Sequence, residues 1–115
     1  MEQFMKNIEF SKAIGMESLV QYQEGQVVSR TLTQNKAVSI TLFAFDQDEE
    51  ISAHDSEGDA MVYILDGTAH ITIGEVKHIV KKGEVIVMPA KVTHALFAAE
   101  KFKMILIVVF KNPIS

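Results

Sequence analysis

The sequence predicts an all-β domain, either a barrel or a jelly roll, and three observations support this fold class. From Gln26 onward the chain is a series of short segments rich in β-branched and aromatic residues, which favour strands. Turn signals that contain glycine separate several of these segments. Several segments are also apolar on both faces, as expected for strands buried between two layers. Many short strands at regular spacing are typical of a sandwich or barrel.

The first 25 residues differ from the rest of the chain. Residues 1–25 are expected to form a short helical or irregular segment that packs on the barrel, and residues 26–115 form the barrel domain. Phe10, Ile14 and Leu19 fit one side of a short helix, although Gly15 disfavours it. The expected strands are VVSRTL, SITLFAF, AMVYILD, AHITI, EVIVMP and KMILIVVF, with turns at Asp66-Gly67, Gly74-Glu75 and Lys82-Gly83.

The composition excludes several function classes. The net charge of −4 disfavours nucleic acid as a partner, and the absence of cysteine excludes disulfides, thiolate metal sites and cysteine nucleophiles. No phosphate-binding loop or serine triad motif is present. The first residues lack signal-peptide features, and the longest apolar run, residues 104–110, is too short to span a bilayer. We therefore expect a cytoplasmic protein that does not bind membranes.

Apolar residues on both strand faces predict a cover over the outer surface. In SITLFAF, Ile40 and Leu42 face one way, and Phe43 and Phe45 face the other. A lone sandwich normally shows one polar face to solvent. The simplest cover is a second subunit, so we expect a homodimer.

A histidine motif lies between Gly83 and Ala98. Gly83, Pro89 and His94 are separated by five and by four residues. With the earlier segment YILDG, the stretch GEVIVMPAKVTHA resembles the second motif of the cupins, which are double-stranded β-helix (jelly-roll) barrels. Lys91 and Ala98 stand where that family usually has glycine and asparagine. The resemblance implies a small single-domain protein of the cupin 2 conserved-barrel family.

The first cupin motif is present in its spacing but not in all of its ligands. His54 falls on its first histidine and Gly67 on its closing glycine, whereas Ser56 replaces the second histidine and Ala60 the glutamate. In the family four side chains bind one divalent metal inside the barrel. The resemblance thus implies that only His54 and His94 remain as metal ligands here. Such donors suit Zn, Ni, Fe, Mn or Cu.

Nearby carboxylates leave two readings of this site open. The candidates are Asp55, Glu57 and Asp59, which belong to an acidic run from residue 46 to residue 59 that contains no lysine or arginine. The run could attract divalent cations, but such runs are more often solvated loops. One reading is a metal at His54 and His94 with a borrowed carboxylate. The other is a metal-free pocket in which both imidazoles bind a ligand or water.

The pocket is expected inside the barrel, which would hold the main cavity of the protein, with His54 and His94 facing each other across it. It combines a few polar groups with apolar side chains, as small-molecule sites do. Its residues are His54, Ser56, Ala60, Met61, Met88, His94 and Phe97. Of the other histidines, His70 is expected to face solvent or the sheet edge, and His78 to point inward as a core residue.

These observations favour a small-molecule-binding barrel of unassigned pathway, with its ligand near the two histidines. The alternative is a metal-dependent cupin enzyme, similar to a dioxygenase or an isomerase, in which the metal polarises substrate or activates oxygen. The alanine at position 60 favours the first function, because it removes a ligand. A third possibility is a barrel whose site has decayed and whose role is assembly. The fold alone does not choose among these, and no catalytic residue is assigned.

Overall fold

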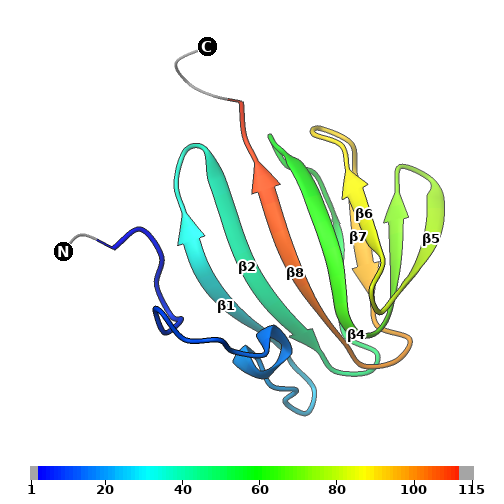
Figure 1. Ribbon diagram of the computed structural model, residues 1–115. Coiled ribbons are helices and arrows are strands. Elements are labelled where there is room, and N and C mark those ends of the chain that lie inside the picture. The colour runs from blue at the N-terminus through cyan, green and yellow to red at the C-terminus, as the bar shows by residue number, and fades with distance from the viewer. Residues whose placement is uncertain (1–2, 112–115) are drawn as a thin grey trace.

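The computed structural model describes residues 3–111, and its eight strands form one curled antiparallel sheet with two halves (Figure 1). The larger half contains, in order, β1 (Val27–Gln34), β2 (Val38–Phe45), β8 (Phe102–Val109), the first part of β4 (Asp59–Ile73) and β6 (Val85–Met88). The smaller half contains β5 (Val76–Lys81), the rest of β4, β7 (His94–Phe97) and β3 (Glu50–His54). The predicted all-β jelly-roll barrel is confirmed.

The long strand β4 joins the two halves. Its first part pairs with β8 and β6, and its second part pairs with β5 and β7. The predicted turn at Asp66-Gly67 is wrong, because Gly67 lies within β4. Its φ is +72°, and a Cβ at this position would overlap the carbonyl oxygen of Lys101. Only glycine fits both conditions without strain, so Gly67 permits the bend rather than a reversal of the chain. The predicted turns after β4 and β5 are confirmed at Gly74-Glu75 and Lys82-Gly83.

Three strands, β3, β5 and β7, lie outside the six predicted ones. They are four to six residues long and mix polar with apolar side chains, so their β pattern is weak. The one helix in residues 3–111 is a 3-10 helix, η1 (Met16–Leu19), and no helix in that range is long and apolar enough to cross a membrane.

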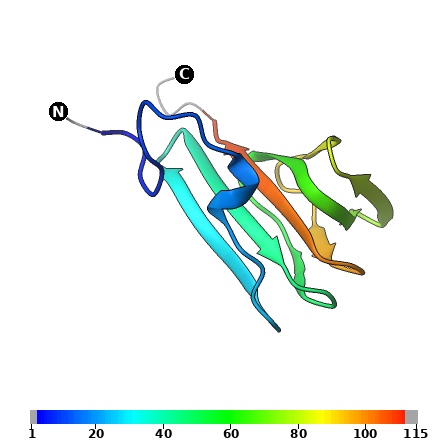
Figure 2. The ribbon, with the colours of Figure 1, turned by 60° about the horizontal axis from the view of Figure 1, so that its bottom comes forward.

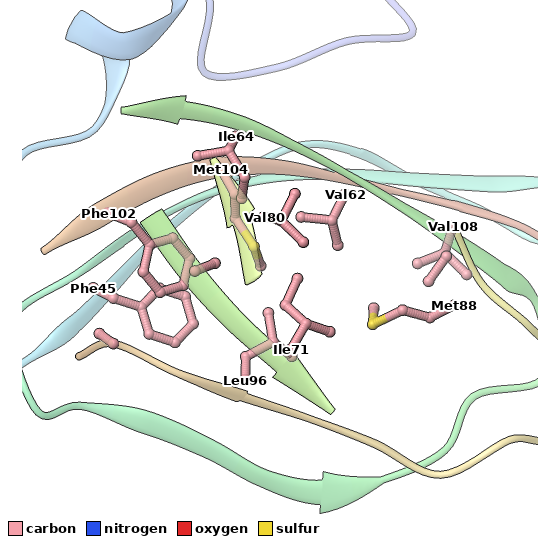
Figure 3. Packing of buried hydrophobic residues seen from close by; sticks show 13 residues of the cluster. Phe45, Val62, Ile64, Ile71, Val80, Met88, Leu96, Phe102, Met104 and Val108 are labelled. Carbon is pink, nitrogen blue, oxygen red and sulfur yellow. The ribbon is translucent and has the colours of Figure 1, made fainter. Parts of the chain in front are cut away.

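The space between the two halves is filled with apolar side chains (Figure 3). Phe45 and Phe102 stack there with ring centroids 4.3 Å apart. Strand alternation places Val62 and Ile64 of β4 inward and Tyr63 between them outward. The largest fully buried members of this interior core are Phe45, Phe102, Ile64, Ile71, Met88, Met104 and Val62. Burial of this apolar surface is the main source of stability.

The N-terminal segment lies across the outer face of β1, β2 and β8 (Figure 2). Its Val20 is buried in a second apolar cluster with Leu32, Leu42, Ala44 and Ile105. Several polar contacts hold the segment. Among them, the Tyr22 hydroxyl donates to the Asp66 carboxylate at 2.6 Å, the Lys103 ammonium to the Glu17 carbonyl at 2.9 Å, and the Arg30 guanidinium to the Leu19 carbonyl at 2.7 Å. From the sequence we expected a second subunit to cover the outer face of the strands, but over these three strands the N-terminal segment of the same chain covers it.

Candidate functional site

His54 and His94 lie side by side where β3 ends and β7 begins. Their Cα atoms are partners in the β3–β7 ladder, and their ring centroids are 4.4 Å apart with the planes inclined at 70°. His94 is 3% exposed and lies on the same side of β7 as the core residue Leu96, whereas His54 is exposed. The fold thus brings one histidine from each motif to a site that solvent can reach.

Both imidazoles make the same kind of hydrogen bond to their own strand. His54 Nδ1 lies 3.0 Å from the carbonyl oxygen of Ser52, and His94 Nδ1 lies 3.2 Å from that of Val92. Because a carbonyl oxygen only accepts, each bond requires a proton on Nδ1, and in the neutral ring the lone pair then lies on Nε2. Each ring can therefore offer Nε2 to a metal or to a hydrogen-bond donor of a ligand. These carbonyl partners could not be predicted from the sequence, because contacts to the backbone leave no signal in residue type.

The environment of His94 favours the neutral ring. Burial lowers the pKa of His94 below its ordinary value, and the neighbouring His54 lowers it further. The hydrogen bond to Val92 and the carboxylate of Asp55 oppose this shift of the pKa. A neutral imidazole is the form that metal binding or hydrogen-bond acceptance requires.

The carboxylates near the pair do not complete a metal site. The Asp59 carboxylate accepts the backbone N–H of Ala90 at 2.8 Å, so it supports the loop after β6. Within residues 3–111 no three histidine, aspartate or glutamate side chains are grouped so that they could hold a metal. A divalent ion at the pair would have two nitrogen donors from this chain, fewer than the three or four typical of protein zinc sites.

The other two positions of the first motif serve the backbone and the core. The Ser56 hydroxyl donates to the Gly58 carbonyl at 2.8 Å, and the Ser56 carbonyl accepts the Lys91 N–H at 2.8 Å. Ser56 therefore links the loops that carry the two motifs. Ala60 pairs with Met88 across β4 and β6, and both are packed into the interior core.

Two residues assigned to the pocket from the sequence, Met61 and Phe97, face outward. Each is 37% exposed, because each follows an inward-facing residue on its strand. The interior, where the main cavity was expected, holds the apolar cluster to which the large side chains of Phe45 and Phe102 belong. A cavity of about 720 Å³ lies outside the barrel, between the N-terminal segment and Arg30 of β1.

The second motif shapes the turn that leads into His94. Lys91 has a φ of +65°, a left-handed conformation that glycine adopts without strain, which explains the family's preference for glycine there. Ala98 is fully buried, and its backbone groups bond to Glu49 and Asp48. The substitutions at both positions therefore leave the backbone of the motif in place.

The remaining histidines belong to other surroundings. His70 lies on the outer face of the smaller half, edge-on to the ring of Phe97 with centroids 6.4 Å apart, and its Nδ1 is buried without a hydrogen-bond partner among the described residues. His78 pairs with the buried Ile71 and so lies on the inward side of β5.

Comparison with known proteins identifies the family. A family model described as a cupin domain matches residues 41–110. The search of curated proteins gave no match. Among solved structures, a conserved protein of unknown function from Streptococcus pyogenes is 43% identical with a TM-score of 0.94, covering 96% of this chain and 97% of that one.

Two further structures carry the family in their descriptions. A cupin superfamily protein from Desulfitobacterium hafniense is 33% identical with a TM-score of 0.88, covering 93% of this chain and 98% of that one. A cupin 2 conserved barrel domain protein from Leptotrichia buccalis is 39% identical with a TM-score of 0.80, covering 82% of this chain and 46% of that one. Because the family model spans more than half of its residues and relatives match it along nearly its whole length, the chain belongs to the cupin family.

Proposed function

We propose that the protein binds a small molecule at the end of the barrel, beside His54 and His94. The observation that carries this proposal is the pair of adjacent rings, 4.4 Å apart, whose Nδ1 atoms are both bound to strand carbonyls. Two Nε2 lone pairs at one site can accept hydrogen bonds from a single ligand. Rings held by packing and by backbone bonds are preorganised for this role.

The surroundings define what the ligand would contact. His94 is almost fully buried beside the interior core, whereas His54 is open to solvent. A matching ligand would carry a hydrogen-bond donor for the two imidazoles and an apolar part that contacts the core residues beside His94. Because the core fills the interior, the ligand lies at the end of the barrel rather than deep within it.

A metal-dependent enzyme, similar to a dioxygenase or an isomerase, is the second candidate. The two unprotonated Nε2 atoms favour it, because a divalent ion such as zinc or nickel needs neutral imidazoles. His54 and His94 would hold the ion, which supplies Lewis acidity or oxygen activation when bound. The incomplete set of donors in residues 3–111 makes this the weaker candidate.

A thermal-shift screen against small metabolites tests the first candidate. We expect at least one compound to raise the melting temperature of the wild-type protein but not that of His54→Ala. His54 is exposed, so its removal leaves the core intact. His78→Ala, on β5, is the matched control and keeps the response. The proposal fails if every stabilising compound acts equally on His54→Ala.

We also propose that the working form is a homodimer. The apolar character of both faces of the strands supports it, and the N-terminal segment covers only part of the outer surface.

A further inference from the structure

The cavity outside the barrel lies between residues 7–19 and Arg30 of β1, and we call it the Arg30 cavity. None of its lining residues belongs to the site at the histidine pair. Its volume of about 720 Å³ is in the range of small-molecule sites. The segment is fixed to β1 at both ends of the cavity: the Asn7 amide donates to the Thr31 carbonyl at 2.8 Å, and the Leu19 carbonyl accepts from Arg30. Because these contacts hold both ends, the walls are formed before a ligand arrives.

The charge of the cavity comes from a guanidinium. Arg30 is half-buried, and within residues 3–111 its guanidinium makes one hydrogen bond, from Nη1 to the Leu19 carbonyl at 2.7 Å, and no ion pair. Its other N–H donors form a planar fork that matches a carboxylate. Lys12 and Glu9 also line the cavity, but their charged groups are 3.4 Å apart and neutralise each other. The lining residues therefore offer one uncompensated positive charge, which suits a monoanion.

Apolar side chains provide another part of the lining. Ile8, Ile14 and Leu19 belong to it, and Ile8 and Leu19 also pack against the second apolar cluster beneath the segment. All three are half-buried, so part of each side chain remains accessible to a ligand. An alkyl chain against them would remove apolar surface from water, which is favourable. The lining thus combines a charged group with a small apolar surface, as small-molecule sites do.

The backbone beside the cavity is unusual. Asn7, which lines the cavity, has a φ of +62°, and Ser11, next to the lining residue Lys12, has a φ of +58°. This left-handed conformation is uncommon for residues other than glycine. Such conformations persist where surrounding contacts hold them, and they are concentrated at binding and active sites. The backbone is thus an observation, independent of the charge, that favours a ligand site here.

We propose that the Arg30 cavity binds a small monocarboxylate with a short apolar chain. The carboxylate would accept hydrogen bonds from the Arg30 guanidinium, and the chain would lie against Ile8 and Ile14. A dianion fits less well, because the lining carries a single uncompensated positive charge. The site is independent of the ligand proposed for the histidine pair.

Titration of the full chain with hexanoate, followed in ¹H–¹⁵N amide spectra, tests the proposal. We expect saturable shifts of the amide resonances of residues 7–19 and Arg30, while those of His54 and His94 stay in place. Hexanol has the same alkyl chain without the carboxylate, so it should bind at least about tenfold more weakly.

Arg30→Gln should raise the dissociation constant of hexanoate by about tenfold or more. Lys77→Gln is the matched control, because it removes the same charge from an exposed position on β5, and it should leave the dissociation constant unchanged. If Arg30→Gln does not fold, Ala13→Glu and Ala13→Gln replace it. Ala13 lines the cavity and is exposed, so both variants keep the contact of Arg30 with Leu19, and only the glutamate should repel the anion.

Three results would overturn the proposal. The first is the absence of saturable hexanoate binding to the wild type. The second is equal binding by Arg30→Gln and Lys77→Gln, or by Ala13→Glu and Ala13→Gln. The third is a set of shifts at His54 and His94 in place of those in the N-terminal segment, which would put the anion at the histidine pair.

Discussion

A carboxylate placed at Ala60 tests whether the barrel interior is a dry core or a water-filled cavity. Ala60 is 2% exposed and has Met88 and Val108 as its cross-strand partners. In Ala60→Glu the new carboxyl would enter an apolar cluster. Such surroundings raise the pKa of a carboxyl by up to about 3 to 5 units from its ordinary value of about 4.3.

The cost follows from the pKa shift. At pH 7 the carboxyl is ionised in the unfolded chain and must take up a proton to fold in its neutral form. Because pH 7 lies about 2.7 units above its ordinary pKa, this protonation costs about 3 to 4 kcal/mol at about 1.36 kcal/mol per unit. Overpacking by the longer side chain adds about 1 to 3 kcal/mol. The total is a large part of the stability of a typical domain, about 5 to 15 kcal/mol. Because the folded pKa is raised, the charge term is absent below about pH 4.3 and grows as pH rises.

Urea denaturation of Ala60→Glu and Ala60→Gln separates charge from size. Both variants carry a side chain of similar length, so the difference between their free energies of unfolding measures the effect of the carboxyl group alone. We expect Ala60→Glu to be less stable by about 3 to 4 kcal/mol at pH 7 and by about 1 kcal/mol at pH 5. Equal stability of the two variants at pH 7 would refute the reasoning, since it would mean that water reaches position 60.

Three further predictions concern the pair and the bend in β4. Because the pKa of His94 is lowered by folding, the unfolded chain binds more protons than the folded chain. Stability should therefore fall as pH drops through about 6.5. In thermal melts, His94→Asn should make the stability depend less on pH. Zinc should bind weakly, with an affinity that falls below about pH 6.5, and His94→Ala should abolish the binding in calorimetric titrations; equal binding by the wild type and His94→Ala would mean that the histidines are not ligands. In urea denaturation, Gly67→Ala should lower the free energy of unfolding by at least about 2 kcal/mol and Gly25→Ala by about 1 kcal/mol. Both glycines have positive φ, but only position 67 lacks room for a Cβ. Equal losses of stability in the two variants would contradict the overlap with Lys101.

Strand pattern and motif spacing predicted the barrel because both depend on local sequence. Alternation in SITLFAF correctly separates Phe43 and Phe45, which contact the interior core, from Leu42, which faces the N-terminal segment. The same rule places Met61 on the outer face of its strand. Met61 was nevertheless assigned to the interior pocket, because it is apolar. Residue type alone is a poor guide where both faces of a strand are apolar.

Other features depend on contacts between distant segments. Gly67 has the sequence signature of a turn, and only its approach to Lys101, the residue before β8, shows that the strand continues through it. The N-terminal cover is fixed by Tyr22 and Asp66, which are 44 residues apart and share no motif. The sequence could therefore name the two site histidines but not what surrounds them.

The central claim is that His54 and His94 present two unprotonated Nε2 atoms to one ligand. A long-range ¹H–¹⁵N correlation spectrum resolves the ring nitrogens of the four histidines in the chain, with His54→Ala and His94→Ala for assignment. At neutral pH we predict a protonated Nδ1 and an unprotonated Nε2 in both rings, and both Nε2 resonances should shift on addition of a compound that stabilises the wild type but not His54→Ala. Protons on Nε2 of either ring in the free protein, or Nε2 resonances that stay in place while that compound binds, would contradict it.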